Sequence, residues 1–433
     1  MNLCLYEDPV VAEFGPLAAL RPVFALRCGA FTLVEKLVRA FPEAQLVLMV
    51  RPELEEWTRI LYPTATVGDP PAGDTLFVNG RLCMTDDEVL HFLAASPLEA
   101  SFMAEGTIFA AKVSGARAAH AAARLREGSP EAAFEDLRYP AEVNAFLARS
   151  AADLIRWSPR QIVQDFRYAF QAGTVRGTIE AGAHVRQPEA IHVARGARVM
   201  AGAVLNAEGG PILVGENAVV EPLAYVEGPA VIGEGSRVKA GAQIREGTVL
   251  GPVCKIGGEV EATVFQGHAN KQHDGFVGHS YVGEWVNLGA GTITSDLKNN
   301  YSNVRYFPSA EAYLARQGID SGQRLLGLSI GDFSKTGIGA TFPTGAVVGC
   351  GCNLYGTSLQ PAYVPSFVWG TPDAMAEHRI DDMIETAARA MERRKVELRV
   401  EFDSRIRQHF DDSRAERERY LRAVAGATGV GGR

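Results

Sequence analysis

The chain has 433 residues, of which 47% are hydrophobic and 22% are charged. This length and composition predict a globular protein of two or three domains and exclude a disordered chain. A net charge of -8, from 43 basic and 51 acidic residues, argues against nucleic-acid binding and leaves a small molecule as the expected partner.

No apolar run approaches the roughly 18 residues of a membrane span, and the start MNLCLYEDP lacks the basic and apolar regions of a signal peptide. We therefore expect a cytoplasmic protein with no membrane partner. The six cysteines form no CxxC pair, so reduced thiols are expected. Cys350 and Cys352 flank one glycine, but without a second pair nearby they predict no metal site.

Residues 1–115 alternate short apolar runs such as LCLY, AQLVLMV and TLFVNG with helical patterns such as TLVEKLVRAF. This alternation is typical of a sheet with helices on its faces and predicts an α/β domain. Residues 116–172 are rich in alanine and regularly spaced arginine, as in ARAAHAAARLREG. They predict a helical connector.

From residue 173 the sequence has a period of six. Eight aliphatic residues follow one another at this interval: Val214, Val220, Val226, Ile232, Val238, Ile244, Leu250 and Ile256. The spacing recurs at Ile330, Thr336, Phe342, Val348 and Leu354. Such a repeat predicts short strands joined by tight corners, about 18 residues per three-sided coil, with one aliphatic side chain per face inside.

The repeat predicts a parallel β-helix over residues 173–371. In the stretch HDGFVGHSYVGEWVNLGAGTIT we expect Phe276, Val282 and Leu288 to point inwards. Residues 298–328 carry no hexad and predict a loop excursion, a feature that is often functional. Residues 372–433 predict a charged helical segment, with one terminal helix.

His268, His273 and His279 lie close together in the sequence. Ligands stacked on one face of the coil would be about 18 residues apart, so these spacings direct the side chains to different faces and predict no metal site. One outward histidine acting as a general base remains open beside an inert role, because an imidazole titrates near neutrality.

Three runs carry a resemblance to a known family: IREGTVLGPVCKIGGEVE, NKQHDGFVGHSYVGEWVNLGAGTITSDLKNNY and GQRLLGLSIGDFSKTGIGA. They resemble the acetyltransferase half of the bifunctional N-acetylglucosamine-1-phosphate uridyltransferase/glucosamine-1-phosphate acetyltransferase family, in its alternative sugar-nucleotidyltransferase-like branch. The resemblance is strong over residues 173–354 and faint before them. It implies a left-handed β-helix, a homotrimer, and acetyl transfer from acetyl-CoA to the amine of an aminosugar 1-phosphate.

The resemblance also implies roles for individual residues. The family's base lies sixteen residues before the GAGT turn, which falls on His273 and not on His279. The asparagine before GAGT corresponds to Asn287 and the phosphate-binding arginine to Arg245. The family's sugar-contacting tyrosine is replaced by Phe276, and its asparagine after GAGTIT by Asp296.

The family's lysine aligns near Thr263, which leaves Lys271 or Lys298 to supply positive charge. In the implied mechanism His273 takes a proton from the amine, Arg245 and Lys271 hold the phosphate, and Asn287 and Asp296 contact the sugar. Backbone N–H groups of the GAGT turn, which includes Ala290, or of Gly339 and Ala340 are candidates to stabilise the oxyanion and to lie against CoA. This step needs no metal.

The first domain contains EFGPLAALRPVFALRCGAFTLVEKL, which resembles the start of sugar-1-phosphate nucleotidyltransferases without their glycine-rich loop. Arg21, Arg27 and Lys36 are candidates to contact the phosphates of UTP or another nucleoside triphosphate. Arg81 stands in VNGR where the family's metal-binding aspartate is expected. Mg²⁺ is therefore expected only if this domain is an active nucleotidyltransferase, and a turn and strand without that function remain the alternative.

Two classes of function remain open. One is acetyl transfer, alone or coupled to nucleotidyl transfer in a UDP-N-acetylglucosamine-type pathway. The alternatives are a sugar-1-phosphate nucleotidyltransferase only, or a non-catalytic hexapeptide scaffold that binds a nucleotide-sugar. The spacing of His273, Asn287 and Arg245 favours acetyl transfer.

Overall fold

The computed structural model describes residues 1–85, 87–137 and 139–428. The chain forms two compact units. Unit 1 contains Met1–Phe14, Leu20–Arg27 and Phe31–Leu154, and unit 2 contains Gly15–Ala19, Cys28–Ala30 and the chain from Ile155 onwards.

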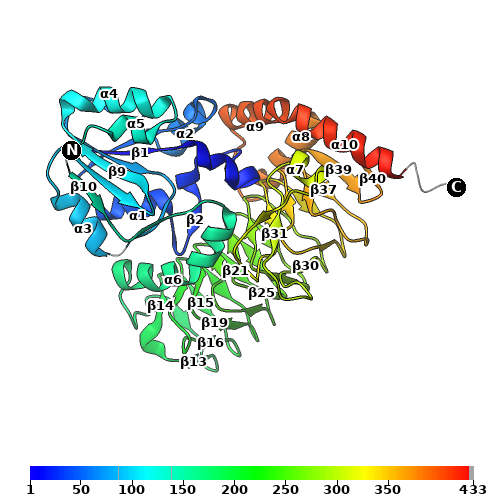
Figure 1. Cartoon of the computed structure of the whole chain (residues 1–433). Coiled ribbons are helices and arrows are strands. Elements are labelled where there is room, and N and C mark those ends of the chain that lie inside the picture. Colours follow the sequence, from blue (N-terminus) through cyan, green and yellow to red (C-terminus); the bar gives the residue numbers. More distant parts are fainter. Residues whose placement is uncertain (86, 138, 429–433) are drawn as a thin grey trace. The chain divides into compact units, whose positions relative to one another are not determined.

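Unit 1 is built on a seven-stranded mixed sheet with the order β10-β8-β9-β6-β1-β4-β5 (Figure 1). Strands β1, β4, β5 and β6 are parallel, and β9 is antiparallel to both β6 and β8. The strands are β1 (Asn2–Tyr6), β4 (Gln45–Met49), β5 (Thr66–Val67), β6 (Thr75–Asn79), β8 (Ala100–Ala104), β9 (Thr107–Val113) and β10 (Tyr139–Glu142). The predicted α/β class of this unit is confirmed.

The helices of unit 1 are α1 (Leu33–Ala40), α2 (Glu55–Leu61), α3 (Asp87–Ala95), α4 (Gly115–Arg126) and α5 (Pro130–Phe134). Helices α4 and α5 cover one face of the sheet, where Ala118, Leu125 and Phe134 pack with Tyr6 and Phe77. The alanines of α4 suit this position because small side chains let a helix lie close to the strands.

The boundaries predicted for the first domain and the connector differ from the structure. Strand β10 lies inside the predicted connector and pairs in parallel with β8. Strand β11 (Ala145–Leu147) pairs with β7 (Leu82–Thr85), and only then does α6 (Ala151–Ala169) begin. Unit 1 therefore extends to Leu154 rather than 115, because edge strands held by backbone hydrogen bonds leave little periodicity in the side chains.

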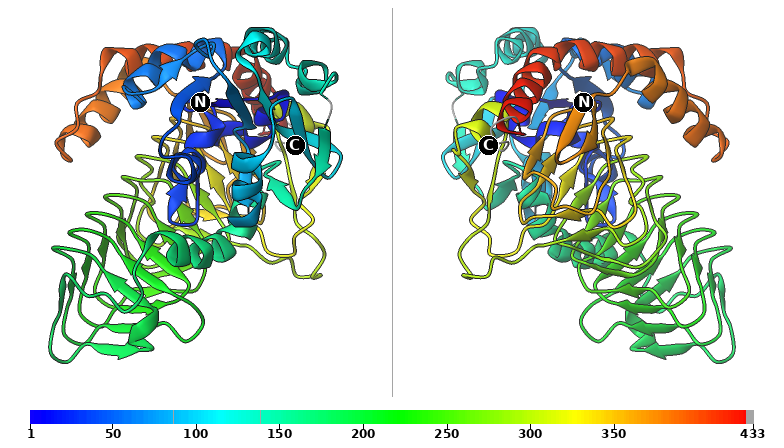
Figure 2. Two further views of the ribbon diagram at one scale, coloured as in Figure 1. Left: turned by 90° about the vertical axis from the view of Figure 1, so that its left-hand side faces the viewer. Right: turned by 90° about the vertical axis from the view of Figure 1, so that its right-hand side faces the viewer.

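Unit 2 contains the predicted left-handed parallel β-helix, whose stacked coils Figure 2 shows from the green to the yellow segment. Face 1 contains β12 (Thr178–Ile179), β15 (Arg198–Val199), β18 (Val219–Val220), β21 (Arg237–Val238), β24 (Lys255–Ile256) and β27 (Asn270–Lys271). Face 2 contains β13 (His184–Arg186), β16 (Val204–Asn206), β19 (Tyr225–Glu227), β22 (Gln243–Ile244), β25 (Glu259–Glu261) and β28 (Phe276–Gly278).

Face 3 is the longest and contains β14 (Ile191–Val193), β17 (Ile212–Val214), β20 (Ala230–Ile232), β23 (Val249–Leu250), β26 (Val264–Phe265), β29 (Tyr281–Val282), β33 (Ser329–Ile330), β36 (Val347–Val348) and β38 (Tyr363–Val364). The last coils add β30 (Ile293–Thr294) paired with β35 (Thr341–Phe342), and a sheet of β34 (Lys335–Thr336), β37 (Asn353–Leu354), β39 (Val368–Thr371) and β40 (Ala374–Glu377).

The hexad residues form the interior of this prism. All eight aliphatic residues from Val214 to Ile256 belong to one buried core, and each is fully buried. Val282 and Leu288 are also buried there, as predicted. The prediction for Phe276 is wrong: Val277 pairs with Val260 in the inward column, and Phe276 lies half-buried on the outer surface beside Glu259.

The reason for this error is the length of one corner. The inward Val282 follows the inward Val277 after five positions instead of six, so a strict period of six is out of register by one. A register shift of one residue moves a strand side chain to the opposite face.

Hydroxyl side chains close several corners from the inside. Ser236 Oγ donates to the Gly251 carbonyl and accepts from the Cys254 N–H, both at 2.8 Å. Ser334 Oγ repeats this arrangement with Gly349 and Cys352 further along the prism. These buried hydroxyls satisfy backbone groups that water cannot reach.

The predicted excursion leaves the coils between β29 and β33, which pair directly with each other. It carries its own hairpin of β31 (Arg305–Tyr306) and β32 (Ile319–Asp320), and a short helix α7 (Ala310–Leu314). The C-terminal segment forms three helices rather than one: α8 (Ile380–Glu392), α9 (Val400–Asp412) and α10 (Arg414–Thr428). Glu416 on α10 accepts from Ala310 N and from the Tyr363 hydroxyl, so the excursion, the prism and α10 are linked.

We predict that Ile244→Ala lowers the free energy of unfolding by about 2–5 kcal/mol, because the side chain is fully buried and the rigid coils cannot close the cavity. Val400→Ala is the control, since Val400 is 71% exposed and should change stability by less than about 0.5 kcal/mol. Scanning calorimetry of both variants measures this, and equal melting temperatures would contradict the assignment of the core.

Candidate functional site

His273 lies on the corner between β27 and β28, where its side chain is exposed. The corner is held from inside by Lys271, which is 1% exposed and pairs with Ile256 in the inward column of face 1. The Lys271 Nζ donates to the carbonyl of Gly257 at 2.8 Å and to the carbonyl of His273 at 2.9 Å. The backbone of His273 is therefore fixed by a buried amine.

Burial lowers the pKa of Lys271 to about 8, and the nearby charge of Asp274 opposes this shift. Because its amine is bonded to two carbonyls inside the prism, Lys271 does not extend to a ligand on the surface. The prediction that it holds a phosphate is thus not supported, and its role is to position the corner.

A glycine is required next to this corner. Gly258 has φ +69°, and a Cβ there would lie 2.6 Å from the Lys271 Nζ and 2.9 Å from the His273 carbonyl oxygen. Any other side chain would displace the amine that anchors the corner.

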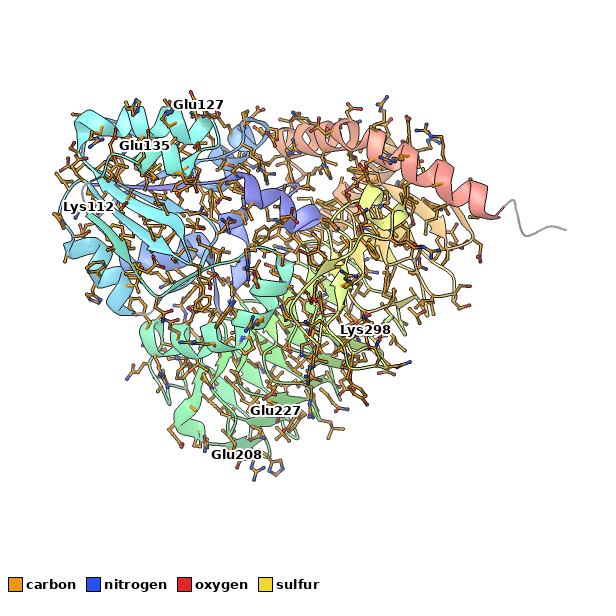
Figure 3. The ribbon with its side chains drawn as sticks, viewed as in Figure 1. Lys112, Glu127, Glu135, Glu208, Glu227 and Lys298 are labelled. Atoms are coloured by element: carbon orange, nitrogen blue, oxygen red, sulfur yellow. The ribbon has the colours of Figure 1, made fainter. Side chains whose placement is uncertain are left out.

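Asn287 and Arg245 do not lie together on one strand. Asn287 is half-buried on the face 1 side. Its backbone forms parallel β-bridges with Asn270 of the coil before it and with Lys335 of the coil after it. Arg245 follows β22 on face 2, and its Nε lies 3.3 Å from Glu227, whose side chain is labelled in Figure 3. Strand β25 separates the strand that precedes Arg245 from β28. His273 lies at the edge of face 2 where each strand begins, whereas Arg245 lies at the edge where each strand ends.

Three glycine N–H groups among the predicted oxyanion donors form hydrogen bonds between the coils. The N–H of Gly339 donates to the Ala290 carbonyl, and the N–H of Gly291 donates to the backbone carbonyl of Asp274. The N–H of Gly289 donates to the Thr336 hydroxyl. The side chain of Ala340 is fully buried in the core. The N–H groups of Gly289, Gly291 and Gly339 are therefore committed to holding the corners together, whereas the oxyanion role of the Ala290 and Ala340 N–H groups stays a prediction.

Asp296 has a partner that the sequence did not predict. Its Oδ2 lies 2.8 Å from Nδ1 of His279, and both side chains are largely buried, at 14% and 16% exposed. The other candidate of this segment, Lys298, donates to the carbonyl of Asn303 within the excursion (Figure 3). The pairing of His279 with Asp296 arises because the chain passes once around the coil between them.

A cluster of cations, also missed in the sequence, lies on face 1 before the His273 corner. Arg237 and Lys255 are register partners on β21 and β24, and Arg394, from the segment after α8, donates to the carbonyl of Val253 and to Asn270 Oδ1. Burial and then the charges of Arg394, Arg237, Arg393 and Lys239 lower the pKa of Lys255. Glu221 is the acidic partner of both Arg237 and Lys239. Such a concentration of positive charge favours binding of an anion.

Unit 1 has a cavity of about 420 Å³ at the carboxyl ends of β1 and β4. Its lining includes Glu7, Asp8, Arg51 and Arg126, and the carboxyl edge of parallel strands is where open α/β sheets bind ligands. The predicted phosphate contacts do not line it: Arg21 is buried, and Arg27 and Lys36 are half-buried on β2 (Arg27–Cys28) and α1.

Arg81 forms a buried ion pair beside this cavity. Its guanidinium contacts both oxygens of Asp8, at 2.6 and 2.8 Å, and the Asn79 amide donates to the same carboxylate at 2.7 Å. Mg²⁺ binds through carboxylate oxygens, and those of Asp8 are already occupied. The residues at this position therefore do not fit a magnesium ion.

The cysteines are all free and buried within the described chain. Burial raises the pKa of Cys352 to about 11, and its Sγ contacts the carbonyl of Pro365. Cys350 is directed to the carbonyl of Pro16 instead, so the two thiols do not converge. In the part of the chain that the structure describes, no helix is long and apolar enough to cross a membrane.

The fold is that of an α/β nucleotidyltransferase-like unit and a left-handed hexapeptide β-helix in one chain. Residues 3–172 match the family model described as sugar nucleotidyl transferase. The chain is 33% identical over 153 residues to the bifunctional protein GlmU of Acidithiobacillus ferrooxidans. The matched residues are 35% of this chain and 31% of that protein. It is 32% identical over 148 residues to a bifunctional sugar-1-phosphate nucleotidylyltransferase/acetyltransferase of Sulfurisphaera tokodaii. Here the matched residues are 34% of this chain and 35% of that protein.

These relatives confirm the resemblance predicted from the sequence motifs. The chain spans about a third of the length of the curated relatives it matches. Among solved structures, a UDP-N-acetylglucosamine acyltransferase of Francisella novicida is similar with a TM-score of 0.31 and 12% identity, over 58% of this chain and 91% of that one.

We predict that Lys271→Met removes a pH dependence of stability. The folded state lowers the pKa of Lys271 to about 8, so the unfolded chain binds more protons between about pH 8 and the ordinary lysine value near 10.4. Stability of the parent therefore rises with pH across this window through this residue. Melting temperatures of the parent and the variant should diverge in favour of the parent from pH 8 to 10, and parallel curves would contradict the buried amine.

Proposed function

We propose that unit 2 transfers an acetyl group from acetyl-CoA to the amine of an aminosugar 1-phosphate, with His273 as the proton acceptor. The observation that carries this proposal is the exposed imidazole on a corner whose backbone is fixed by the buried Lys271 amine. A catalytic base has to be held in place while its side chain reaches the substrate. The named functions of the relatives, which include acetyl transfer, agree with this role.

In the proposed reaction the amine nitrogen attacks the thioester carbonyl carbon, and the carbon–sulfur bond breaks to release the CoA thiolate. His273 takes the proton that the nitrogen loses, and the thiolate takes up a proton on leaving. The cations of face 1, Arg237, Lys239 and Lys255, are the groups proposed to hold phosphate oxygens of the sugar or of CoA. Asn287 lies beyond this cluster on face 1 and is proposed to contact the sugar.

The same proposal includes a homotrimer and a cytoplasmic location. Both rest on the family resemblance, and the exposed apolar side chains of Leu223, Ile338 and Leu359 on the coils agree with an assembly that covers them.

We expect His273→Ala to lower the rate of acetyl transfer by roughly 10²- to 10⁴-fold with little change in the KM for the sugar phosphate, because a lost base slows proton removal and not binding. The measurement is steady-state acetylation of glucosamine 1-phosphate with acetyl-CoA. His184→Ala is the control, since His184 is also exposed but begins a strand at the opposite end of face 2. Equal activity of His273→Ala and the parent would remove His273 from the mechanism.

A second candidate function is nucleotidyl transfer in unit 1, which the family match of residues 3–172 and the cavity favour. The Arg81–Asp8 pair opposes it, so we propose that the cavity binds a nucleotide or nucleotide-sugar without transfer. Incubation with UTP, N-acetylglucosamine 1-phosphate and Mg²⁺, followed by mass spectrometry, should yield no nucleotide-sugar. Its formation, and its loss in Arg51→Ala, would establish unit 1 as a transferase instead.

A further inference from the structure

A groove of about 380 Å³ lies at the corner between face 2 and face 3, one corner further along the coil than His273. Three elements line it. Helix α6 contributes Ile155, Arg156 and Pro159, two coil corners contribute Ala262 and His279, and the end of the excursion contributes residues 322–325. Nothing in the proposed acetyl transfer uses this groove.

The geometry of His279 is that of an oriented imidazole. An ionised carboxylate can only accept a hydrogen bond, so the 2.8 Å contact with Asp296 puts the proton on Nδ1. The other ring nitrogen, Nε2, is then a hydrogen-bond acceptor. A histidine fixed in this tautomer is suited to accept a bond from a hydroxyl.

The backbone around His279 is held by the returning excursion. His279 has φ +43°, which is uncommon for a residue other than glycine. Its carbonyl accepts from the N–H of Gly327, and Ser280 Oγ accepts from the N–H of Leu328. Ala262, the other corner residue of the groove, has φ +41°, so this backbone conformation is shared by these corners, and the returning excursion fixes the one at His279.

Two arginines give the groove its charge. Arg156 and Arg324 are exposed and come from different elements, α6 and the excursion. Within the described residues neither guanidinium forms an ion pair with a carboxylate, and that of Arg156 lies 5.3 Å from the centre of the Trp157 ring. Two guanidinium groups in the lining of one groove suit a phosphate, which accepts several hydrogen bonds at once.

We propose that this groove binds a phosphorylated ligand of monosaccharide size. The phosphate pairs with Arg156 and Arg324, and the His279 imidazole, oriented by Asp296, accepts a hydrogen bond from a ligand hydroxyl. The apolar groups of Ile155, Pro159 and Leu325 contact the carbon skeleton. The volume suits a small ligand of this kind, and the site is separate from the His273 corner.

The test is the rate at which diethyl pyrocarbonate modifies each histidine of the full-length protein, measured by peptide mass spectrometry. Glucosamine 1-phosphate, inorganic phosphate and glucosamine are compared as ligands. At about ten times its dissociation constant, a ligand in the groove slows modification of His279 roughly tenfold, since only the empty groove reacts. We expect this protection from glucosamine 1-phosphate, weaker protection from inorganic phosphate and none from glucosamine.

The arginine variants decide whether the groove is responsible. Arg156→Gln combined with Arg324→Gln should abolish protection of His279, whereas Arg316→Gln, an exposed arginine of the same excursion outside the groove, should leave it intact. Protection that persists in the double variant, or equal protection by glucosamine, would overturn the proposal, as would the absence of protection in the parent. Protection of His273 in the same spectra reports on the acetyl-transfer site, so the two proposals fail independently.

Discussion

The β-helix depends on one constraint: its interior accepts one inward side chain per face in each coil, and each must stack on the one before. Backbone bonds such as Lys239 N to Ile256 O and Arg245 N to Val260 O fix every coil to the next. Because the strands are only two or three residues long, fixing them also fixes the corners. A side chain on a corner is therefore positioned by the whole stack, which is why corners in such a prism are suited to carry chemistry.

Lys271 departs from this constraint. It occupies an inward position that its neighbours Ile256 and Val238 fill with aliphatic carbon, and burial of an amine costs free energy unless its donors are bonded. Two carbonyls satisfy the amine, and one of them belongs to His273. A well-packed aliphatic residue would be the simpler solution for stability alone. The position of Lys271 is explained by the corner that it holds.

Much of the fold could be predicted from the sequence because the hexad is a local pattern. It identified the inward columns from Val214 to Ile256, and the missing hexad identified the excursion. It could not give the register at Phe276, since a corner shortened by one residue leaves no mark in composition. Nor could it give the pairing of His279 with Asp296, because residues 17 apart meet only if the number of residues in that coil is known. The role of Lys271 was missed for the same reason: its inward direction depends on the coil, and a lysine is ordinarily placed outside.

Strand β28 connects the two corners. It has three residues, with the His273 corner before it and the His279 corner after it. A Cβ at Gly278, the last of the three, would overlap Asp296 Oδ2 and the ring of Phe276. Glycine at this position thus lets the carboxylate approach His279 while the phenyl ring lies across the strand. Since the inward Val277 is locked in the core and Gly278 N donates to Thr294 Oγ1, neither corner can shift along the face without the other. The sequence HDGFVGH, which contains no recognisable helix or strand pattern, is explained by this requirement: it spaces two histidines by one short strand and keeps that strand narrow enough for an acidic partner from the next coil.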